Sequence, residues 1–212
     1  MKIISIKKRR IDAEIIFDDN SKLYVDYKII FDNGLRKNDD IPETLKKDLV
    51  IQNEKLKIKN SAFRLLSRRS HSRFELIQKL HKKKFDINLI DAIVAELIEQ
   101  DFLDDLKFAK LYAEEKFDKK IIGKNKIKAG LISKGVNQKI IEKVISEMDL
   151  SSAEENAFEL AQKKIKFISG SKSGNKNIKQ KISTYLYSKG FESDIIYNVL
   201  KKMDFLDDYS DL

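Results

Sequence analysis

The sequence predicts a mainly α protein: tandem three-helix repeats in an elongated array, preceded by a small N-terminal β-hairpin region. Three observations support this prediction. The 212 residues include only one proline and seven glycines, which favours long helical segments. One apolar pattern of helical spacing recurs three times after residue 58. Before that residue, apolar and polar residues alternate, as in strands.

The N-terminal region predicts a hairpin followed by a short helix. The turn "DDNS" separates two alternating apolar sets, which are Ile11, Ala13, Ile15 and Phe17 and then Leu23, Val25 and Tyr27. Asn33 and Gly34 indicate another turn, and Pro42 suits the first turn of a helix that reaches about Gln52. We interpret the run from Lys7 to Arg10 as a solvated charged face and "NEKLKIKN" as a linker.

The repeat is clearest in two stretches, "SKGVNQKII" at 133–141 and "SKGFESDII" at 188–196. Each leads into apolar residues spaced i, i+1, i+4, i+5 and i+8, which form one stripe on a helix. The three stripes are Leu89, Ile90, Ile93, Val94 and Leu97; Ile140, Ile141, Val144, Ile145 and Met148; and Ile195, Ile196, Val199, Leu200 and Met203.

Local signals bound each stripe helix. Gly135 and Gly190 suit the left-handed position after a helix, whereas Lys84 at the corresponding place departs from that preference. Polar residues then open the stripe helices, with Asp86, Asn137, and Glu192 or Ser193 as candidate N-caps.

Two further helical segments precede each stripe. They are expected at 61–69 and 73–83, at 106–120 and 124–134, and at 153–167 and 176–189, with a capping box between Ser72 and Glu75. The predicted domains are therefore 1–58 for the hairpin region and 59–105, 106–150 and 151–212 for the repeats. Such units bury their apolar faces against their neighbours, which predicts shared interfaces.

An acidic motif, "FLDD", occurs at Phe102 to Asp105 and again at Phe205 to Asp208. Paired carboxylates are common in metal sites, but no histidine or further acidic set accompanies these. We prefer the interpretation that Asp104 and Asp105 cap the helix that begins there.

The sequence gives little support to catalysis. Without cysteine there is no disulfide, cysteine-bound zinc or thiol nucleophile. His71 and His81 belong to no metal or nucleophile motif and are expected at the surface, and "GLISKG" lacks the lysine of a phosphate loop. We therefore expect no enzymatic activity and no cofactor. No apolar run could span a bilayer, so a cytoplasmic protein without a membrane partner is expected.

The net charge of +9 favours acidic partners, and the charges are sorted by segment. Residues 61–84 hold eight lysines and arginines against the single acid Glu75, while residues 85–105 hold seven acids and no base. Residues 106–135 hold nine lysines against three acids. Stacked repeats would thus present a basic face. Tyr112, Phe117, Tyr185 and Tyr187 lie among these bases, either to stack on unpaired nucleic-acid bases or to fill the core.

Three stretches carry a family resemblance: "AFRLLSRRSHSRFELIQKL" from Ala62, "FLDDLKFAKLYAEEKF" from Phe102 and "GKNKIKAGLISKGV" from Gly123. The chain resembles the RecX regulators of the bacterial RecA recombinase. The resemblance implies tandem three-helix repeats and a non-enzymatic modulator lying in the groove of a RecA filament on single-stranded DNA. Such a modulator inhibits filament growth, ATP hydrolysis, strand exchange and stimulated repressor cleavage.

We expect the basic faces of the first two repeats to meet acidic filament surface or DNA phosphate, with the chain as a monomer. The candidate residues are Arg68, Arg69, Arg73, Lys82, Lys83 and Lys84 in the first repeat and Lys116, Lys119, Lys120, Lys124, Lys126 and Lys128 in the second. The DNA partner is expected to be single-stranded, with double-stranded DNA as a second option. One alternative function is an autonomous nucleic-acid-binding protein that uses residues 61–84 as a helix-turn-helix. Another is a protein-interaction scaffold indifferent to DNA.

Overall fold

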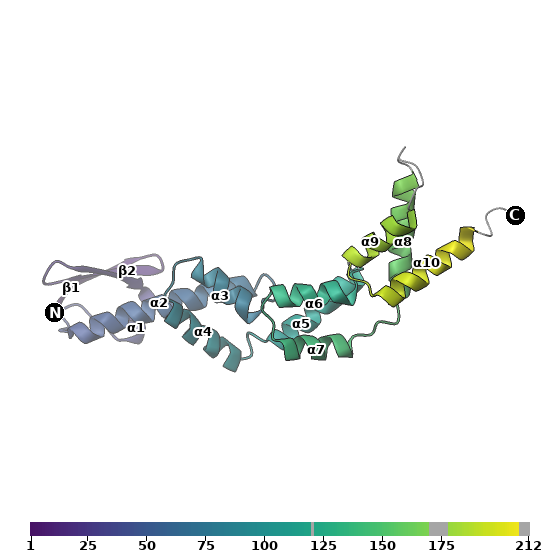
Figure 1. Ribbon diagram of the computed structural model, residues 1–212. Coiled ribbons are helices and arrows are strands. Elements are labelled where there is room, and N and C mark those ends of the chain that lie inside the picture. Colours follow the sequence, from purple (N-terminus) through teal and green to yellow (C-terminus); the bar gives the residue numbers. More distant parts are fainter. Residues whose placement is uncertain (120, 170–177, 208–212) are drawn as a thin grey trace. The chain divides into compact units, whose positions relative to one another are not determined.

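The computed structural model describes residues 1–119, 121–169 and 178–207. They form two compact units. The first unit is Met1–Ser70 with Leu76–Leu103, and the second is His71–Glu75 with the described residues from Asp104 onward. Figure 1 shows a short sheet followed by helices, as the sequence predicts.

The N-terminal sheet has three antiparallel strands in the order β1-β2-β3, where a two-stranded hairpin was predicted. Strands β2 (Asp12–Phe17) and β3 (Lys22–Asp26) are the predicted pair. The additional strand is β1 (Ile3–Arg9), which includes most of the run interpreted as a charged face. A register shift between Ile3 and Ser5 explains the missed strand, because a bulge breaks the alternation by which strands are recognised.

Both ends of the predicted hairpin need correction. Ile11 lies in the β1–β2 turn and is 73% exposed rather than part of a strand. Tyr27 begins α1 (Tyr27–Asp32), because the side chain of Asp26 accepts a hydrogen bond from the Lys28 backbone nitrogen at 2.8 Å and caps that helix. The predicted turn after α1 is confirmed, since Gly34 has φ +63°.

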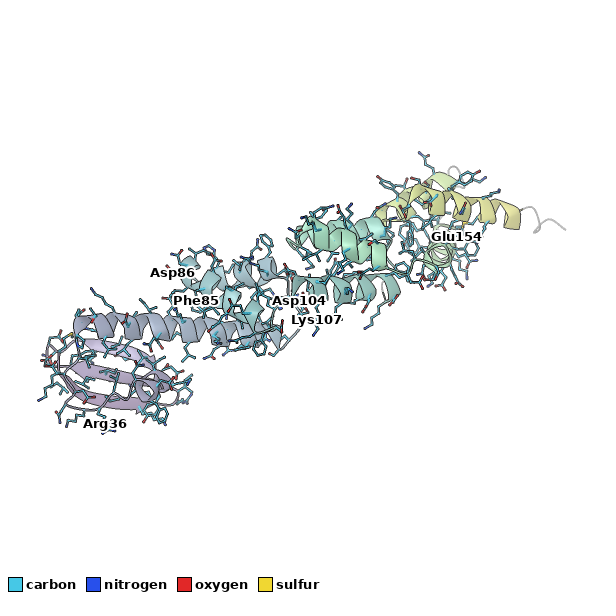
Figure 2. The ribbon with its side chains drawn as sticks, turned by 90° about the horizontal axis from the view of Figure 1, so that it is seen from below. Arg36, Phe85, Asp86, Asp104, Lys107 and Glu154 are labelled. Carbon is cyan, nitrogen blue, oxygen red and sulfur yellow. The ribbon has the colours of Figure 1, made fainter. Side chains whose placement is uncertain are left out.

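Helix α2 (Glu43–Leu66) replaces the predicted short helix and linker with one continuous element. Its first half adds Leu49 to the core beneath the sheet, and its second half adds Ile58 and Ala62 to the core of the first repeat. Between them the buried Asn53 accepts from the Asp26 nitrogen at 2.9 Å and donates to the Tyr24 carbonyl at 3.2 Å. Figure 2 shows α2 lying along the sheet.

The first repeat consists of the second half of α2 with α3 (Arg73–His81) and α4 (Ile87–Glu99). The predicted apolar stripe is confirmed, because Ile90, Ile93, Val94 and Leu97 are all buried. Asp86, labelled in Figure 2, caps α4 by accepting from the nitrogens of Asn88 and Leu89.

The other two repeats have the same order of helices (Figure 1). The second contains α5 (Asp105–Glu114), the π-helical turn η1 (Glu115–Lys119), α6 (Lys124–Ser133) and α7 (Gln138–Glu147). The third contains α8 (Ala153–Ser169), α9 (Ile178–Ser188) and α10 (Ser193–Asp207). The two cores share partly buried Ile195, so these repeats do pack on each other as expected.

A left-handed residue ends the turn before each stripe helix. Gly135 has φ +67° and Gly190 has φ +88°. Lys84 occupies the same conformation with φ +63°, although its side chain disfavours it. The three turns thus have equivalent backbone conformations, although the first has a lysine where the other two have glycine.

The substitution Lys57→Pro tests the continuity of α2. Lys57 is exposed in the middle of the helix, so proline removes one backbone hydrogen bond and clashes with the preceding turn. We expect a loss of about 3 kcal/mol in the free energy of unfolding, measured by urea denaturation with circular dichroism. Lys57→Ala, the control, should change it by less than about 0.5 kcal/mol. A harmless proline would instead indicate a linker.

Candidate partner-binding surface

The first turn of α3 packs against the second repeat at what we call the first junction. The Ser72 hydroxyl donates to the Lys134 carbonyl at 2.6 Å and also accepts from the Glu75 nitrogen at 3.1 Å, which confirms it as the cap of α3. The Glu75 carboxylate pairs with the Lys134 ammonium at 2.6 Å. A Cβ on Gly135 would lie 2.5 Å from Phe74, so only glycine fits there without a shift.

The carboxylates of the acidic motif at Asp104 and Asp105 cap helices, which is the interpretation that the sequence favoured. Asp104, labelled in Figure 2, accepts from the nitrogens of Leu106 and Lys107 at the start of α5. Asp105 does something the sequence did not reveal: it accepts from the Arg73 nitrogen at 2.7 Å and so caps α3 from another helix. The expectation that His71 lies at the surface is wrong, because it is 2% exposed beside this junction.

The second junction repeats this arrangement between the second and third repeats. The nitrogens of Gly123 and Asn125 donate to the carbonyls of Lys189 and Gly190, each at 3.0 Å. A Cβ on Gly123 would lie 2.3 Å from the Gly190 oxygen, so the two backbones are in direct contact. The start of α6 is therefore held by the turn that follows α9.

The two junctions explain why the chain repeats "SKG". In each copy the lysine carbonyl accepts from the first turn of the previous repeat's second helix: Lys134 from Ser72, and Lys189 from Gly123. The left-handed glycine that follows lets the chains approach closely. The repeated "SKG" turn is thus the segment by which each of these repeats packs against the one before it.

In the first unit, the predicted partner-binding residues are all exposed. Arg68 and Arg69 lie just after α2, and the Arg69 guanidinium donates to the Ser70 carbonyl at 2.7 Å. Lys82, Lys83 and Lys84 form the turn after α3, which we call the lysine turn. This turn is equivalent to the "SKG" turns of the later repeats, but it stands in the first copy, with no repeat before it in the sequence.

In the second unit, the predicted residues are divided between surface and structure. Arg73 and Lys119 are exposed and Lys128 is half-buried, while Lys120 lies outside the described residues. The Lys116 ammonium lies 5.1 Å from the centre of the Tyr112 ring. Lys124 and Lys126 belong to the second junction.

The last two of these predicted partner contacts also form bonds inside the second unit. The Lys124 ammonium pairs with the Glu192 carboxylate at 2.7 Å, and the Lys126 ammonium donates to the Ser188 carbonyl at 2.8 Å. Both bonds join α6 to the third repeat. Sequence alone did not show these two bonds, because the partner residues are more than 60 positions away. The aligned "SKG" copies were the one signal that the two segments are related.

Other lysines also form ion pairs with carboxylates of their own unit. The Lys110 ammonium hydrogen-bonds to Glu147 at 2.8 Å, which raises the pKa of Lys110 and lowers the pKa of Glu147. Glu154, labelled in Figure 2, pairs with Lys202, and this hydrogen bond lowers the pKa of Glu154. The number of lysines available to a partner is therefore smaller than the number of lysines in the sequence.

The aromatic residues named from the sequence differ in burial. Phe117 is buried in the core of the second repeat, and Tyr112 is half-buried beside Lys116 and Lys134. Tyr185 is half-buried as well, whereas Tyr187 is exposed.

Among the described residues, no helix has both the length and the apolar character needed to cross a bilayer. The described part of the chain also holds no group of three or more histidine or acidic side chains placed to bind a metal ion.

Gly190→Ala tests the close approach at the second junction. Gly34 is the control, because it also has a positive φ but has open space where a Cβ would point. Gly34→Ala should lower the free energy of unfolding by about 1–2 kcal/mol from backbone strain alone. Gly190→Ala, whose Cβ meets Lys126 backbone atoms at 2.4 Å, should lose about 1–3 kcal/mol more. Equal losses in urea denaturation would contradict the contact.

Exchanging the charges of Lys124 and Glu192 tests the structural role of this pair. Each side chain is about one third exposed, so we expect a coupling energy of about 0.5–1 kcal/mol. Lys124→Glu alone should destabilise the second unit, and adding Glu192→Lys should recover most of the loss. The measurement is a double-mutant cycle of unfolding free energies. A coupling energy of zero would mean that Lys124 is free for a partner after all.

Comparison with known proteins matches each repeat to a family model. The model described as "RecX, first three-helix domain" matches residues 59–97. The models for the second and third RecX three-helix domains match residues 104–145 and 152–200. Together these matches cover more than half of the chain.

Whole-chain comparisons agree with these matches. "Regulatory protein RecX" of Clostridioides difficile (strain 630) is 33% identical over 91% of this chain and 93% of its own length. Its namesake from Clostridium perfringens (strain 13 / Type A) is 29% identical over 94% of each chain. The crystal structure of a regulatory protein RecX has the same fold, with a TM-score of 0.73 at 21% identity over 95% of this chain and 98% of that chain. RecX from Lactobacillus salivarius gives a TM-score of 0.63 at 27% identity over 73% and 99% of the two chains. The chain therefore belongs to the RecX family.

Proposed function

We propose that this protein regulates a RecA-type recombinase without catalysing a reaction itself. It binds in the groove of the recombinase filament on single-stranded DNA, across adjacent protomers. Binding inhibits filament growth, ATP hydrolysis, strand exchange and stimulated repressor cleavage. Membership of a family of regulatory proteins supports the regulatory part of this proposal. The inhibitory part comes from the family resemblance of the sequence.

The observation that carries the proposal is the exposed lysine turn. In the second and third repeats the equivalent turns receive the first turn of the preceding repeat's second helix. In the first repeat Lys82, Lys83 and Lys84 are instead exposed to solvent, and the Lys83 ammonium also donates to the Ser61 hydroxyl at 3.4 Å. A surface with this charge attracts acidic protein or phosphate.

The charges around the lysine turn are sorted in the way a directional contact requires. The second half of α2, α3 and the lysine turn carry the bases of the first repeat, and α4 carries acids such as Asp91 and Glu99, which are exposed. Lys59 pairs with Glu96 of α4 at 3.1 Å, so part of the acidic charge is compensated inside the repeat. The lysine turn is left as a concentrated positive patch on this unit.

Reversal of two lysines in this turn gives the decisive variant. Recombinase ATPase on single-stranded DNA is measured with increasing protein, starting well below one molecule per recombinase protomer. The unaltered chain should inhibit. Lys82→Glu with Lys83→Glu should weaken inhibition at least about tenfold without unfolding the protein, since exposed charges contribute little to stability.

Lys139→Glu with Lys143→Glu is the matched control. Both lysines are exposed on α7, a stripe helix, and the change in net charge is the same. We expect this control to inhibit like the unaltered protein. If both double variants lose inhibition equally, net charge and not the lysine turn is responsible. If the unaltered chain never inhibits although it binds DNA, the alternative of an autonomous nucleic-acid-binding protein replaces the proposal.

A further inference from the structure

The third repeat carries a surface that the proposed function does not use. Helix α9 contacts both α8 and α10, and these two helices also contact each other. A cavity of about 540 Å³ lies between α8 and α9, lined by Lys164, Lys181 and Tyr185 among others. A second cavity of about 400 Å³ lies between α9 and α10, lined by Tyr187 and Tyr197 among others. Thr184 lines both, so the two hollows adjoin across α9.

Large aromatic side chains are exposed around these hollows. Tyr187 is 70% exposed and Tyr197 is 66% exposed, and the two line the same cavity from different helices. Phe167, at the end of α8, is 77% exposed. Aromatic rings contribute most to stability when they are buried, so exposed rings gathered beside a cavity mark a binding surface.

The same surface is positively charged. The Lys164 ammonium lies 5.5 Å from the centre of the Phe167 ring and 5.3 Å from that of Tyr185. The Lys189 ammonium lies 5.4 Å from the Tyr185 ring. Helix α9 itself contains no acidic residue, and the described residues lining the two cavities include none. A ligand here meets cations and aromatic faces together.

Single-stranded nucleic acid has the matching chemistry. Its bases expose flat π faces that stack on aromatic side chains, and its phosphates bind lysine. A duplex keeps its base faces stacked on one another and cannot use the tyrosines in this way. An acidic peptide would satisfy the lysines but leave two exposed tyrosine rings flanking a cavity without a stacking partner. We propose that the third repeat binds single-stranded nucleic acid, with bases stacking on Tyr187 and Tyr197 and phosphates on Lys164 and Lys181.

The test uses the full chain without any recombinase, so its result does not depend on the proposed function. Binding of a fluorescein-labelled oligo-dT of about 20 nucleotides is followed by anisotropy at low salt. Tyr187→Ala with Tyr197→Ala should weaken binding at least about fivefold for each base that stacks. Tyr187→Phe with Tyr197→Phe keeps the rings and should bind within about twofold of the unaltered chain. Phe31→Ala removes a ring that is 78% exposed in α1 and should have no effect.

A second measurement separates stacking from charge. The chain has seven tyrosines and no tryptophan, so tyrosine emission reports directly on stacking. Oligo-dT should quench this emission in the unaltered chain and much less in the double alanine variant. Binding to a duplex of equal length should change by less than about twofold. The proposal is wrong if the alanine variant binds oligo-dT like the unaltered chain, if duplex binding falls equally, or if the unaltered chain does not bind oligo-dT.

Discussion

The second unit depends on one kind of contact, in which the start of a helix meets the end of the corresponding helix in the next repeat. A helix start has free backbone N–H groups and a helix end has free carbonyls. At the second junction these groups satisfy each other directly, through Gly123 and Asn125 on one side and Lys189 and Gly190 on the other. At the first, the Ser72 hydroxyl replaces one backbone donor. Each repeat therefore completes the hydrogen bonding of its neighbour, which is how a small three-helix unit becomes part of a stable array.

The same contact decides what the lysines do. Where a turn is covered by the preceding repeat, nearby ammonium groups form bonds across the junction, as Lys124, Lys126 and Lys134 do. Where the turn stands first in the series, its lysines face solvent. A lysine-rich sequence thus yields both structural and accessible cations, and the position in the repeat separates them.

The parts that sequence predicted well are those set by local chemistry. The three stripe helices, their left-handed turns and the caps Asp86, Asn137 and Asp104 depend only on residues a few positions apart. The missed parts depend on distant partners. Strand β1 was missed because a bulge disturbs its alternation. The continuity of α2 was missed because Asn53, which looks like a linker residue, forms its hydrogen bonds with two residues of β3.

The candidate surface was predicted only in outline, for the same reason. Charge sorting located Lys82, Lys83 and Lys84, all of which are exposed. It could not show that Lys124 pairs with Glu192, because nothing in local spacing brings those residues together. The exposure of Tyr197, between the helices of the third repeat, likewise emerges only when α9 and α10 are in place.

The continuity of α2 has a mechanical consequence. Its 24 residues span about 36 Å at 1.5 Å per residue, and the sheet grips one end while the first repeat is built on the other. The sheet and the first repeat are thus joined by one continuous, stiff helix. A partner that bound the N-terminal sheet and rotated it would therefore also move the lysine turn.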